Sequence, residues 1–477
     1  MSETSPAAVV ILAAGEGKRM KSRTPKVLHP LCGRTLLGHA LAAADELNPA
    51  RLVVVVGHGR ELVTAEVTAV APQALVVRQD QQLGTGHAVR MVTEAIGPVP
   101  GTVVVSYGDM PLLRGETLRE LVDRHHQGGN AVTVLTARGD AAGYGRIVRG
   151  ADGAFLRIVE DRDATPEERA IDEYNSGCYA FDGTLLADAI KRVTTDNEQQ
   201  QEYLTDVVAI LRGDGHQVGT LLADDAGEIA GVNDRIQLAQ ARRALNDRVL
   251  DGWMLAGVTI IDPASTWIDV TVRIGQDAEI SPQAQLQGAT VIGDGARIGP
   301  GCLLEDTVVG EDAVVLHAVC RQAEIGPRAT VGPYAYLRPG ASVAEDAHIG
   351  TYVELKKASI GPGAKVPHLS YVGDATIGAG ANIGAGTIFA NYNGVAKNHT
   401  TVGQHAFVGS NTVLVAPVTL GDGAYTAAGS AITDGVPAGD LGVARGRQHN
   451  SDGWVVRNRE ETRSAEAAKQ VRSEDPV

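Results

Sequence analysis

The stretch IGQDAEISPQAQLQGATVIGDGARIGPGCLL, residues 274–304, places an aliphatic side chain at every sixth position. The same interval returns in three later runs and reaches Ile432, often with glycine after the aliphatic residue. This rhythm is typical of a β-solenoid, in which three short strands make one coil and each strand points one aliphatic side chain inward. We predict a solenoid from about Ile261, with these residues in its core: Ile274, Ile280, Leu286, Ile292, Ile298, Leu304, Ile325, Val331, Leu337, Val343, Ile349, Leu355, Ile360, Val366, Val372, Val402, Val408, Leu414, Leu420 and Ile432.

Composition excludes several classes of protein. Glycine is abundant, at 57 of 477 residues, and aromatic residues are only 4%, as expected of a fold that turns often and packs small side chains. A net charge of −15 argues against a protein that binds nucleic acid or a basic protein of membrane surfaces. No apolar stretch approaches the ~18–20 residues that span a bilayer. Four distant cysteines indicate reduced thiols in a cytoplasmic protein: Cys32, Cys178, Cys302 and Cys320.

The first half alternates short β-branched runs with helical patterns, which favours a mostly parallel sheet covered by helices on both faces. The expected strands are Ala8–Leu12, Leu52–Val56, Val103–Val105 and Val132–Leu135, and the expected helices include Leu36–Glu46 and Glu116–His126. A helical stripe over Ile236–Leu250 predicts a helix that links two domains. The predicted division is therefore 1–235, a linker helix at 236–257, the solenoid at 258–455 and a charged, mobile tail at 456–477 that has room for a short helix.

A glycine-rich loop follows the first expected strand, in the sequence LAAGEGKR at residues 12–19, and Thr24-Pro25-Lys26 comes shortly after it. Glycines allow peptide N–H groups to approach phosphate oxygens, at or near the start of a helix whose dipole favours anions. The run is neither a dinucleotide fingerprint, since Met20 occupies the third glycine position, nor a Walker loop. Arg19 and Lys26 can neutralise a triphosphate from two directions.

This run resembles the nucleotidyltransferases that join a sugar 1-phosphate to a nucleoside triphosphate. Gln79 and the segment at 82–87 resemble the loop by which uridylyl members read a pyrimidine base. The resemblance implies a UTP and UDP-sugar site at Leu12, Ala13, Gly15, Lys26, Gln79, Gly84, Thr85, Tyr107, Asp109, Gly145, Glu160, Asn175 and Asn233, with Arg19 and Lys26 catalytic. Such a transfer needs no protein base, because the sugar phosphate is already an anionic nucleophile and cations relieve the charge crowding at phosphorus.

Two residues are candidate ligands of Mg²⁺. Asp109 ends an expected central strand, where α/β proteins place ligands, although it could also be a plain turn residue. Asn233 resembles the second metal ligand of the family, and its alternative role is the N-cap of the following helix. Mg²⁺ takes few carboxylates and completes its shell with phosphate and water oxygens.

Polar residues also recur at about one coil along the solenoid. Arg338 and Lys356 are separated by three full repeats, so we expect them ~4.8 Å apart and bound to a phosphate, or else extended outward into water. Asn391, Ser410, Ala428 and Arg445 follow one another at intervals of roughly one coil. This spacing predicts that the four residues line one long groove. A polar loop at 387–400 interrupts the rhythm, and insertions in solenoids often bind ligands. His368 lies about one coil below this loop; a lone histidine is more often structural, but here it is a candidate base for an amine that attacks a thioester.

Over residues 6–455 the chain resembles the bacterial bifunctional family of N-acetylglucosamine-1-phosphate uridylyltransferase / glucosamine-1-phosphate N-acetyltransferase. That resemblance implies a left-handed solenoid, where the usual crossover preference predicts the opposite hand. It implies a cytoplasmic homotrimer with acetyltransferase sites between subunits, Mg²⁺, acetyl-CoA and UTP as cofactor and co-substrates, and a product that feeds the cell wall. It assigns His368 as proton acceptor, Arg338, Lys356, Tyr371 and Asn382 to the amino-sugar phosphate, Ala385, Tyr392, Ser410, Ala428 and Arg445 to acetyl-CoA, and Asn391 to both ligands.

Two alternatives remain at this point. The solenoid could serve only assembly or regulation beside a single nucleotidyltransferase, although His368 and the loop at Asn391 and Tyr392 have no purpose in such a solenoid. A non-enzymatic scaffold, as in translation-factor exchange subunits that reuse both folds, does not need Arg19, Lys26 and Asp109.

Overall fold

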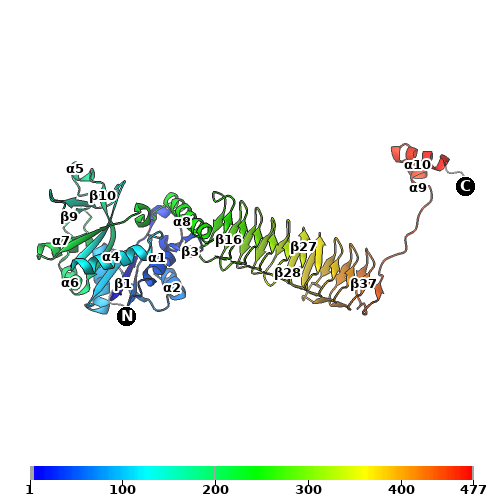
Figure 1. The fold of residues 1–477 in the computed structure, drawn as a ribbon, viewed down its shortest axis with the longest axis horizontal. Helices are drawn as coiled ribbons and strands as arrows, with labels where there is room; N and C mark the ends of the chain where they lie inside the picture. The colour runs from blue at the N-terminus through cyan, green and yellow to red at the C-terminus, as the bar shows by residue number, and fades with distance from the viewer. Residues whose placement is uncertain (1–4, 198, 475–477) are drawn as a thin grey trace. The chain divides into compact units, whose positions relative to one another are not determined.

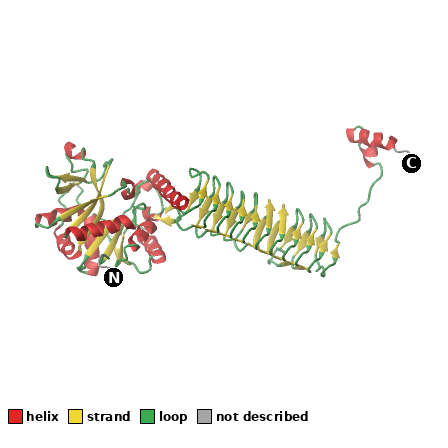
Figure 2. Cartoon of the chain, in the orientation of Figure 1, coloured by secondary structure: helices red, strands yellow, loops and turns green. Residues whose placement is uncertain are grey.

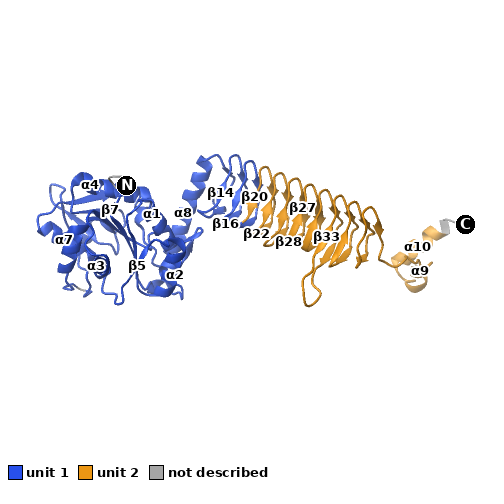
Figure 3. Ribbon diagram, turned by 90° about the horizontal axis from the view of Figure 1, so that it is seen from below, with its two compact units in different colours: residues 1–306 blue, residues 307–477 orange. Residues whose placement is uncertain are grey.

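The computed structural model describes residues 5–197 and 199–474. The chain divides into two compact units, residues 1–306 and 307–477 (Figure 3). The first unit contains an α/β part, the long helix α8 and the beginning of the solenoid, and the second contains the rest of the solenoid and the tail (Figure 1). In the described part of the chain, no helix combines the length and apolar character needed to cross a membrane.

The α/β part contains a nine-stranded sheet whose central order is β11-β7-β10-β6-β1-β4-β5, with β8 and β9 attached beside β10. Neighbouring strands are parallel from β6 to β5, but β10 is antiparallel to both β6 and β7, so the sheet is mixed. The strands are β1 (Ala8–Ala13), β4 (Leu52–Val56), β5 (Leu75–Arg78), β6 (Thr102–Tyr107), β7 (Val132–Arg138), β8 (Arg146–Arg149), β9 (Phe155–Val159), β10 (Glu173–Asp182) and β11 (Val218–Leu222), beside a small hairpin of β2 (Pro30–Leu31) and β3 (Arg34–Thr35).

Helices cover both faces of this sheet, as predicted (Figure 2). Successive residues of a strand point to opposite faces, so Val9, Ile11 and Ala13 of β1 pack with α1, α2 and α4, whereas Ala8, Val10 and Leu12 pack with α3, α6 and α7. The helices of this part are α1 (Leu36–Asp45), α2 (Arg60–Val70), α3 (Thr85–Ile96), α4 (Gly115–Gly128), α5 (Pro166–Arg169), α6 (Gly183–Ala189), α7 (Leu204–Gly213) and α8 (Arg235–Leu255), with short 3₁₀ turns η1 (Lys18–Met20), η2 (Lys26–Leu28), η3 (Ile190–Arg192) and η4 (Ala226–Ile229).

Every aliphatic residue of the six-residue rhythm is buried, as the sequence predicts. In the first unit Ile280 pairs in parallel with Ile298, and Leu286 with Leu304, so three repeats make one coil. The solenoid strands of this unit are β12 (Thr259–Ile260), β13 (Trp267–Ile268), β14 (Arg273–Ile274), β15 (Glu279–Ile280), β16 (Gln285–Gln287), β17 (Val291–Ile292), β18 (Arg297–Ile298) and β19 (Leu303–Glu305).

In the second unit the parallel strands alternate between two sheets and thus form the flat sides of a parallel β-helix. One side is made by β21 (Val314–Val315), β24 (Thr330–Val331), β27 (His348–Thr351), β29 (Lys365–His368), β31 (Asn382–Ile383), β34 (Phe407–Val408), β37 (Tyr425–Thr426) and β39 (Leu441–Gly442). The other sides are made by β20 (Val308–Val309), β22 (Val319–Arg321), β23 (Glu324–Ile325), β25 (Tyr336–Leu337), β26 (Ser342–Val343), β28 (Glu354–Ile360), β30 (Tyr371–Ile377), β32 (Ile388–Ala390), β33 (Thr400–Val402), β35 (Val413–Val415), β36 (Val418–Leu420) and β38 (Ala431–Ile432).

Coil length is not constant in the second unit. The coil that pairs Ile349 with Val366 is shorter than three full repeats, whereas the coil that pairs Ile377 with Val402 is longer. The extra residues form the polar loop between β32 and β33, which Tyr392 and Lys397 close by an antiparallel bridge. Figure 3 shows a loop that leaves the coils beside β33.

The C-terminal segment contains two helices, α9 (Trp454–Asn458) and α10 (Arg463–Glu474), where the sequence left room for one short helix. Residues 475–477 of the predicted tail lie outside the described residues. Cys178, Cys302 and Cys320 are buried, and Cys32 is partly buried.

Candidate active sites

A pocket of about 640 Å³ opens in the α/β part, at the carboxyl ends of β1 and β6. Every residue of the predicted nucleotide set lines it, and so does Arg19. The tertiary structure therefore gathers into one cavity residues that lie between Leu12 and Asn233 in the sequence.

Lys26 stands at the centre of the charged end of this pocket. Its ammonium contacts the carboxylate of Asp109 and lies 3.2 Å from Oδ1 of Asn233. The peptide N–H of Val232 donates to the carbonyl oxygen of Asp109 at 2.9 Å, which holds the two segments together. Two oxygen ligands thus converge on one position that already attracts a cation.

The alternative role of Asn233 as a helix cap is wrong. The N-cap of α8 is Asp234, whose Oδ1 accepts from the N–H groups of Ile236 and Gln237, each at 2.9 Å. The side chain of Asn233 is thereby left to face the pocket. Asp109 does lie in the turn after β6, but its carboxylate contacts Lys26 rather than its own turn.

The glycine loop differs from the prediction in one respect. It is followed only by the 3₁₀ turn Lys18–Met20, which is too short to supply a helix dipole. A Cβ built on Gly15 meets no atom within 4 Å, so an oxyanion has room to approach its backbone. The positive charge at this end comes from the side chains of Arg19 and Lys26.

Another part of the pocket lining is built by Gln79 and the first turn of α3. Nε2 of Gln79 donates to the carbonyl oxygen of Gly84 at 3.0 Å and lies 3.0 Å from Nδ1 of His87. Gly84 has a φ of 113°, and a Cβ there would lie 2.4 Å from the carbonyl oxygen of Glu202, so only glycine fits.

Glu160 and Asn175 also line the pocket. Burial, followed by the charges of Asp163 and Asp206, raises the pKa of Glu160, although Thr205 donates a hydrogen bond to it at 3.0 Å. Asn175 is tied within the protein, because its Oδ1 accepts from the N–H of Gly177 and its Nδ2 donates to the hydroxyl of Tyr179.

Gln199 and Gln237 also line the pocket, although neither was predicted from the sequence. Gln82 donates to the carbonyl oxygen of Ala14 at 2.6 Å, and Gln237 accepts from the N–H of Asn233 at 2.7 Å. Gln199 precedes α7 and Gln237 lies on α8, and only the fold brings these two residues to the pocket.

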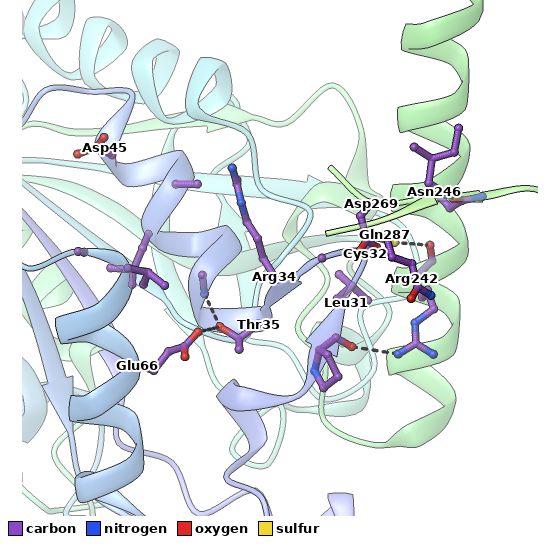
Figure 4. A pocket seen from close by; sticks show the side chains of 18 of the residues that line it. Leu31, Cys32, Arg34, Thr35, Asp45, Glu66, Arg242, Asn246, Asp269 and Gln287 are labelled. Carbon is purple, nitrogen blue, oxygen red and sulfur yellow. Dashed lines mark hydrogen bonds between the residues drawn. The ribbon is translucent and has the colours of Figure 1, made fainter. Parts of the chain in front are cut away.

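A larger cavity, of about 1050 Å³, also lies in the first unit, but none of the predicted site residues lines it (Figure 4). The hairpin at 30–35 forms one wall, where Arg242 donates to Pro30 and Thr35 donates to Glu66. A Cβ on Gly33 would lie 2.8 Å from Cβ of Asp269, so the hairpin packs tightly on the first coil. These contacts are structural.

The predicted phosphate-binding cations of the second unit each have a carboxylate partner. Arg338 pairs with Glu354 at 2.9 Å, and the buried Lys356 pairs with Asp374 at 2.9 Å. Asn391 also donates to Asp374, a residue that was not predicted from the sequence. Burial raises the pKa of Asp374, but the hydrogen bonds from Lys356 and Asn391 outweigh this effect and hold it below its usual value.

The loop at 391–399 returns to this cluster. Lys397 lies close enough to Lys356 that the neighbouring ammonium lowers its pKa, while Asp374 opposes the effect. The hydroxyl of Tyr371 belongs to the same group, since a Cβ on Gly373 would lie 2.5 Å from it and 2.6 Å from Nδ2 of Asn391. The predicted residues Lys356, Tyr371 and Asn391 therefore gather beside Asp374, and Arg338 lies one coil before Lys356 in its pair with Glu354.

His368 ends β29 and is exposed in the single chain. Backbone hydrogen bonds between successive coils show which residues lie next to His368 along the solenoid. The peptide N–H of Leu369 donates to the carbonyl oxygen of Thr351, and the N–H of Gly386 donates to that of His368. In the next coils, the N–H of Asn411 donates to the carbonyl oxygen of Ala385, and the N–H of Gly429 donates to that of Ser410. His368, Ala385 and Ser410 thus occupy equivalent places in successive coils. Ala428 follows Ser410 in this column, one coil further on.

The predicted step from Asn391 to Ser410 is wrong. Ala390 pairs with Val415, and the residue one coil before Ser410 is Ala385, because the polar loop lengthens its coil and shifts the count. Asn382 is also apart from the Lys356 cluster in one chain: it pairs with Lys365 and Phe407 on one side of the prism, whereas Tyr371 lies on another. Tyr392 and Arg445 are exposed.

Known families match both halves of the chain. A MobA-like NTP transferase domain matches residues 9–224, a bacterial transferase hexapeptide (six repeats) matches 271–306, and a hexapeptide repeat of succinyl-transferase matches 399–434.

Curated relatives match over the full length. A protein of Streptomyces avermitilis is 60% identical over 100% of this chain and 99% of its own, and proteins of Streptomyces coelicolor and Thermobifida fusca are each 59% identical over 99% of both chains. All three are named "Bifunctional protein GlmU". With both domain types present and a match to these relatives from end to end, the chain belongs to the bifunctional GlmU family.

Proposed function

We propose that the chain catalyses two successive transfers that yield UDP-N-acetylglucosamine. The β-helix transfers an acetyl group from acetyl-CoA to the amine of glucosamine 1-phosphate. The α/β part then transfers a uridylyl group from UTP to N-acetylglucosamine 1-phosphate and releases pyrophosphate. The observation that carries this proposal is the convergence of Lys26, Asp109 and Asn233 at one end of a pocket lined by the whole predicted nucleotide set.

In the uridylyl step the chain binds the two substrates and neutralises the charge of their phosphate groups. Arg19 and Lys26 take the phosphates of UTP, and the sugar phosphate oxygen attacks the α-phosphorus as pyrophosphate leaves on the opposite side. Asp109 and Asn233 would hold Mg²⁺, because their two oxygens already converge on a cation and oxygen ligands suit this ion. When bound, Mg²⁺ would supply further positive charge at the reacting phosphates.

In the acetyl step His368 accepts a proton from the sugar amine while the amine nitrogen attacks the thioester carbonyl and the CoA thiolate leaves. Arg338, Lys356, Tyr371 and Asn382 bind the amino-sugar phosphate. The column at Ala385, Ser410 and Ala428 receives acetyl-CoA, together with Asn391, Tyr392 and Arg445. The peptide N–H groups of Ala385, Ser410 and Ala428 make no hydrogen bond with the described residues, so they are available as donors to the ligand.

The proposed assembly is a homotrimer, which the distribution of these residues supports. Asn382 lies on a different side of the prism from Tyr371, so a site that uses both draws on two chains. A column of exposed aromatic rings lies along one corner of the coils. His317, Tyr334 and Tyr352 stack there at centroid distances of 5.3 and 5.5 Å, and the side chain of Leu369 is 61% exposed. An exposed apolar surface of this kind favours contact with another protein chain. We assign this surface to contact between copies of the chain.

The functional division is 1–235 for uridylyl transfer, 236–257 for the linker helix, 258–455 for acetyl transfer and 456–477 for the tail. A purely structural solenoid is the second candidate. It is disfavoured by the buried Lys356–Asp374 pair, since a structural coil gains little from an ion pair removed from water.

The decisive experiment incubates the purified protein with glucosamine 1-phosphate, acetyl-CoA, UTP and Mg²⁺ and identifies the products by mass. The proposal predicts N-acetylglucosamine 1-phosphate and then UDP-N-acetylglucosamine with pyrophosphate. Uridylyl transfer to supplied N-acetylglucosamine 1-phosphate without any acetylation would leave the structural solenoid as the answer.

A further inference from the structure

The amide of Gln79 is fixed on two sides at the base end of the nucleotide pocket. Its Nε2 lies 3.0 Å from the carbonyl oxygen of Gly84 and 3.0 Å from Nδ1 of His87. Both side chains are almost fully buried, with 5% of Gln79 and 6% of His87 exposed. Gln79 nevertheless lines the pocket, whereas His87 does not.

These contacts determine which way the amide points. The carbonyl oxygen of Gly84 can only accept, so the atom of Gln79 that faces it is the NH₂ group. The second hydrogen of that group points to Nδ1 of His87, which accepts only when it carries no proton. The imidazole is therefore neutral, with its hydrogen on Nε2.

With both donors of the amide used, its oxygen is what remains for a ligand. Oε1 of Gln79 makes no hydrogen bond with the described residues. A group that can only accept discriminates between the two RNA pyrimidines, because N3 of uracil carries a hydrogen and N3 of cytosine carries a lone pair. A reversed amide would present NH₂ and favour cytosine instead.

We propose that His87 is a positioning residue that holds the Gln79 amide with its oxygen toward the base, and thereby makes the site select a pyrimidine that donates at N3. This inference rests on the proposed uridylyl transfer. His87 does not touch the nucleotide in this scheme, and its effect passes entirely through Gln79.

The frame around the two side chains is rigid enough for such a role. The peptide N–H of Gly86 donates to the carbonyl oxygen of Glu202 at 2.8 Å, and the N–H of Glu202 donates to Leu83 at 2.7 Å. Gly84 is also packed against the backbone of Glu202. His87, in the first turn of α3, therefore approaches Gln79 from a fixed position.

The test compares kcat/KM for UTP with kcat/KM for CTP. His87→Leu removes the acceptor, and we expect the UTP preference to fall about tenfold, the worth of one hydrogen bond, mainly through KM for UTP. His87→Asn can place Oδ1 near the position of Nδ1, so it should restore most of the preference. His125→Leu is the matched control: His125 is also buried, at 4% exposure, but its Nδ1 contacts Thr133 outside the pocket, so the ratio should not change.

A double-variant cycle separates positioning from general damage. Gln79→Leu should lower the UTP preference by itself, and adding His87→Leu should lower it no further, because His87 acts only through the amide. An unchanged ratio in His87→Leu, or a further fall in the double variant, would overturn the proposal. If His87→Leu unfolds, His87→Met gives the same comparison with a flexible apolar side chain. A wild-type protein that uses no nucleoside triphosphate at all would instead refute the proposed uridylyl transfer.

Discussion

The ammonium of Lys26 bridges Asp109 and Asn233, which are distant in the sequence and become neighbours where the 231–233 segment meets the end of β6. In this arrangement a protein cation occupies the point at which we place Mg²⁺. Substitutions of Asp109 and of Lys26 therefore test the metal site that we propose at this point.

Asp109→Asn removes the carboxylate at this point. UDP-N-acetylglucosamine formation should fall on the order of 100-fold or more, because an amide holds a divalent cation weakly, while acetyl transfer should remain intact. The two activities are measured separately, with N-acetylglucosamine 1-phosphate or glucosamine 1-phosphate as the starting sugar. Equal loss of both activities would contradict separate sites.

Lys26→Met removes the competing ammonium. In the absence of nucleotide the variant should bind Mn²⁺ roughly tenfold more tightly than the wild type, even though its uridylyl activity is lower. Titration followed by electron paramagnetic resonance reports binding without turnover. Lys21→Met, an exposed lysine outside the pocket, is the matched control, and weaker Mn²⁺ binding in Lys26→Met would contradict competition.

Lys356→Gln leaves Asp374 without its ion-pair partner. KM for glucosamine 1-phosphate should rise by about tenfold or more and exceed any change in KM for acetyl-CoA, because we propose that the lost charge binds the sugar phosphate. The neighbouring exposed residue gives the control, since Lys357→Gln should leave both constants unchanged. Unaltered kinetics in Lys356→Gln would rule out a phosphate site at this lysine.

His368→Ala should lower kcat for acetyl transfer by about 100-fold or more and leave uridylyl transfer unchanged. A general base acts only when unprotonated, so the wild-type rate should fall at acid pH and the variant should lose that dependence. The pH profile of kcat checks this, and a wild-type profile retained in His368→Ala would assign the proton to another group.

Glu160→Gln tests how far the ionised form of a buried carboxylate destabilises the folded protein. Because the folded-state pKa of Glu160 is raised, the folded protein binds that proton more tightly, and the stability this provides at low pH is lost as the pH rises through the folded value. The ligand-free variant should therefore unfold at a higher temperature than the wild type at about pH 8 and at a similar temperature near pH 4. It should also bind the sugar nucleotide about tenfold more weakly, since it loses an ionised acceptor. Calorimetry at the two pH values tests the first statement, and a stabilisation that is equal at both would contradict it.

Prediction succeeded where a residue's role is local. The inward position of Ile280 or Leu355 follows from a six-residue period, because each short strand has one side chain that faces the core. It failed for the step from Asn391 to Ser410, because counting residues cannot reveal that the polar loop leaves the coil and shifts the register. The antiparallel strand β10 was missed for a similar reason, since strand direction depends on neighbours distant in sequence.

The sequence by itself determined the two architectures, part of the pocket lining in the α/β part and the basic loop at Arg19 and Lys26, since periodicity and short motifs are written in consecutive residues. Only the tertiary structure decided that Asp374 joins Lys356 to Asn391, that Asp234 rather than Asn233 caps α8, and that His87 lies against the amide of Gln79. Hydrogen-bond partners are chosen by distance and direction in space, and a linear order of residues contains neither.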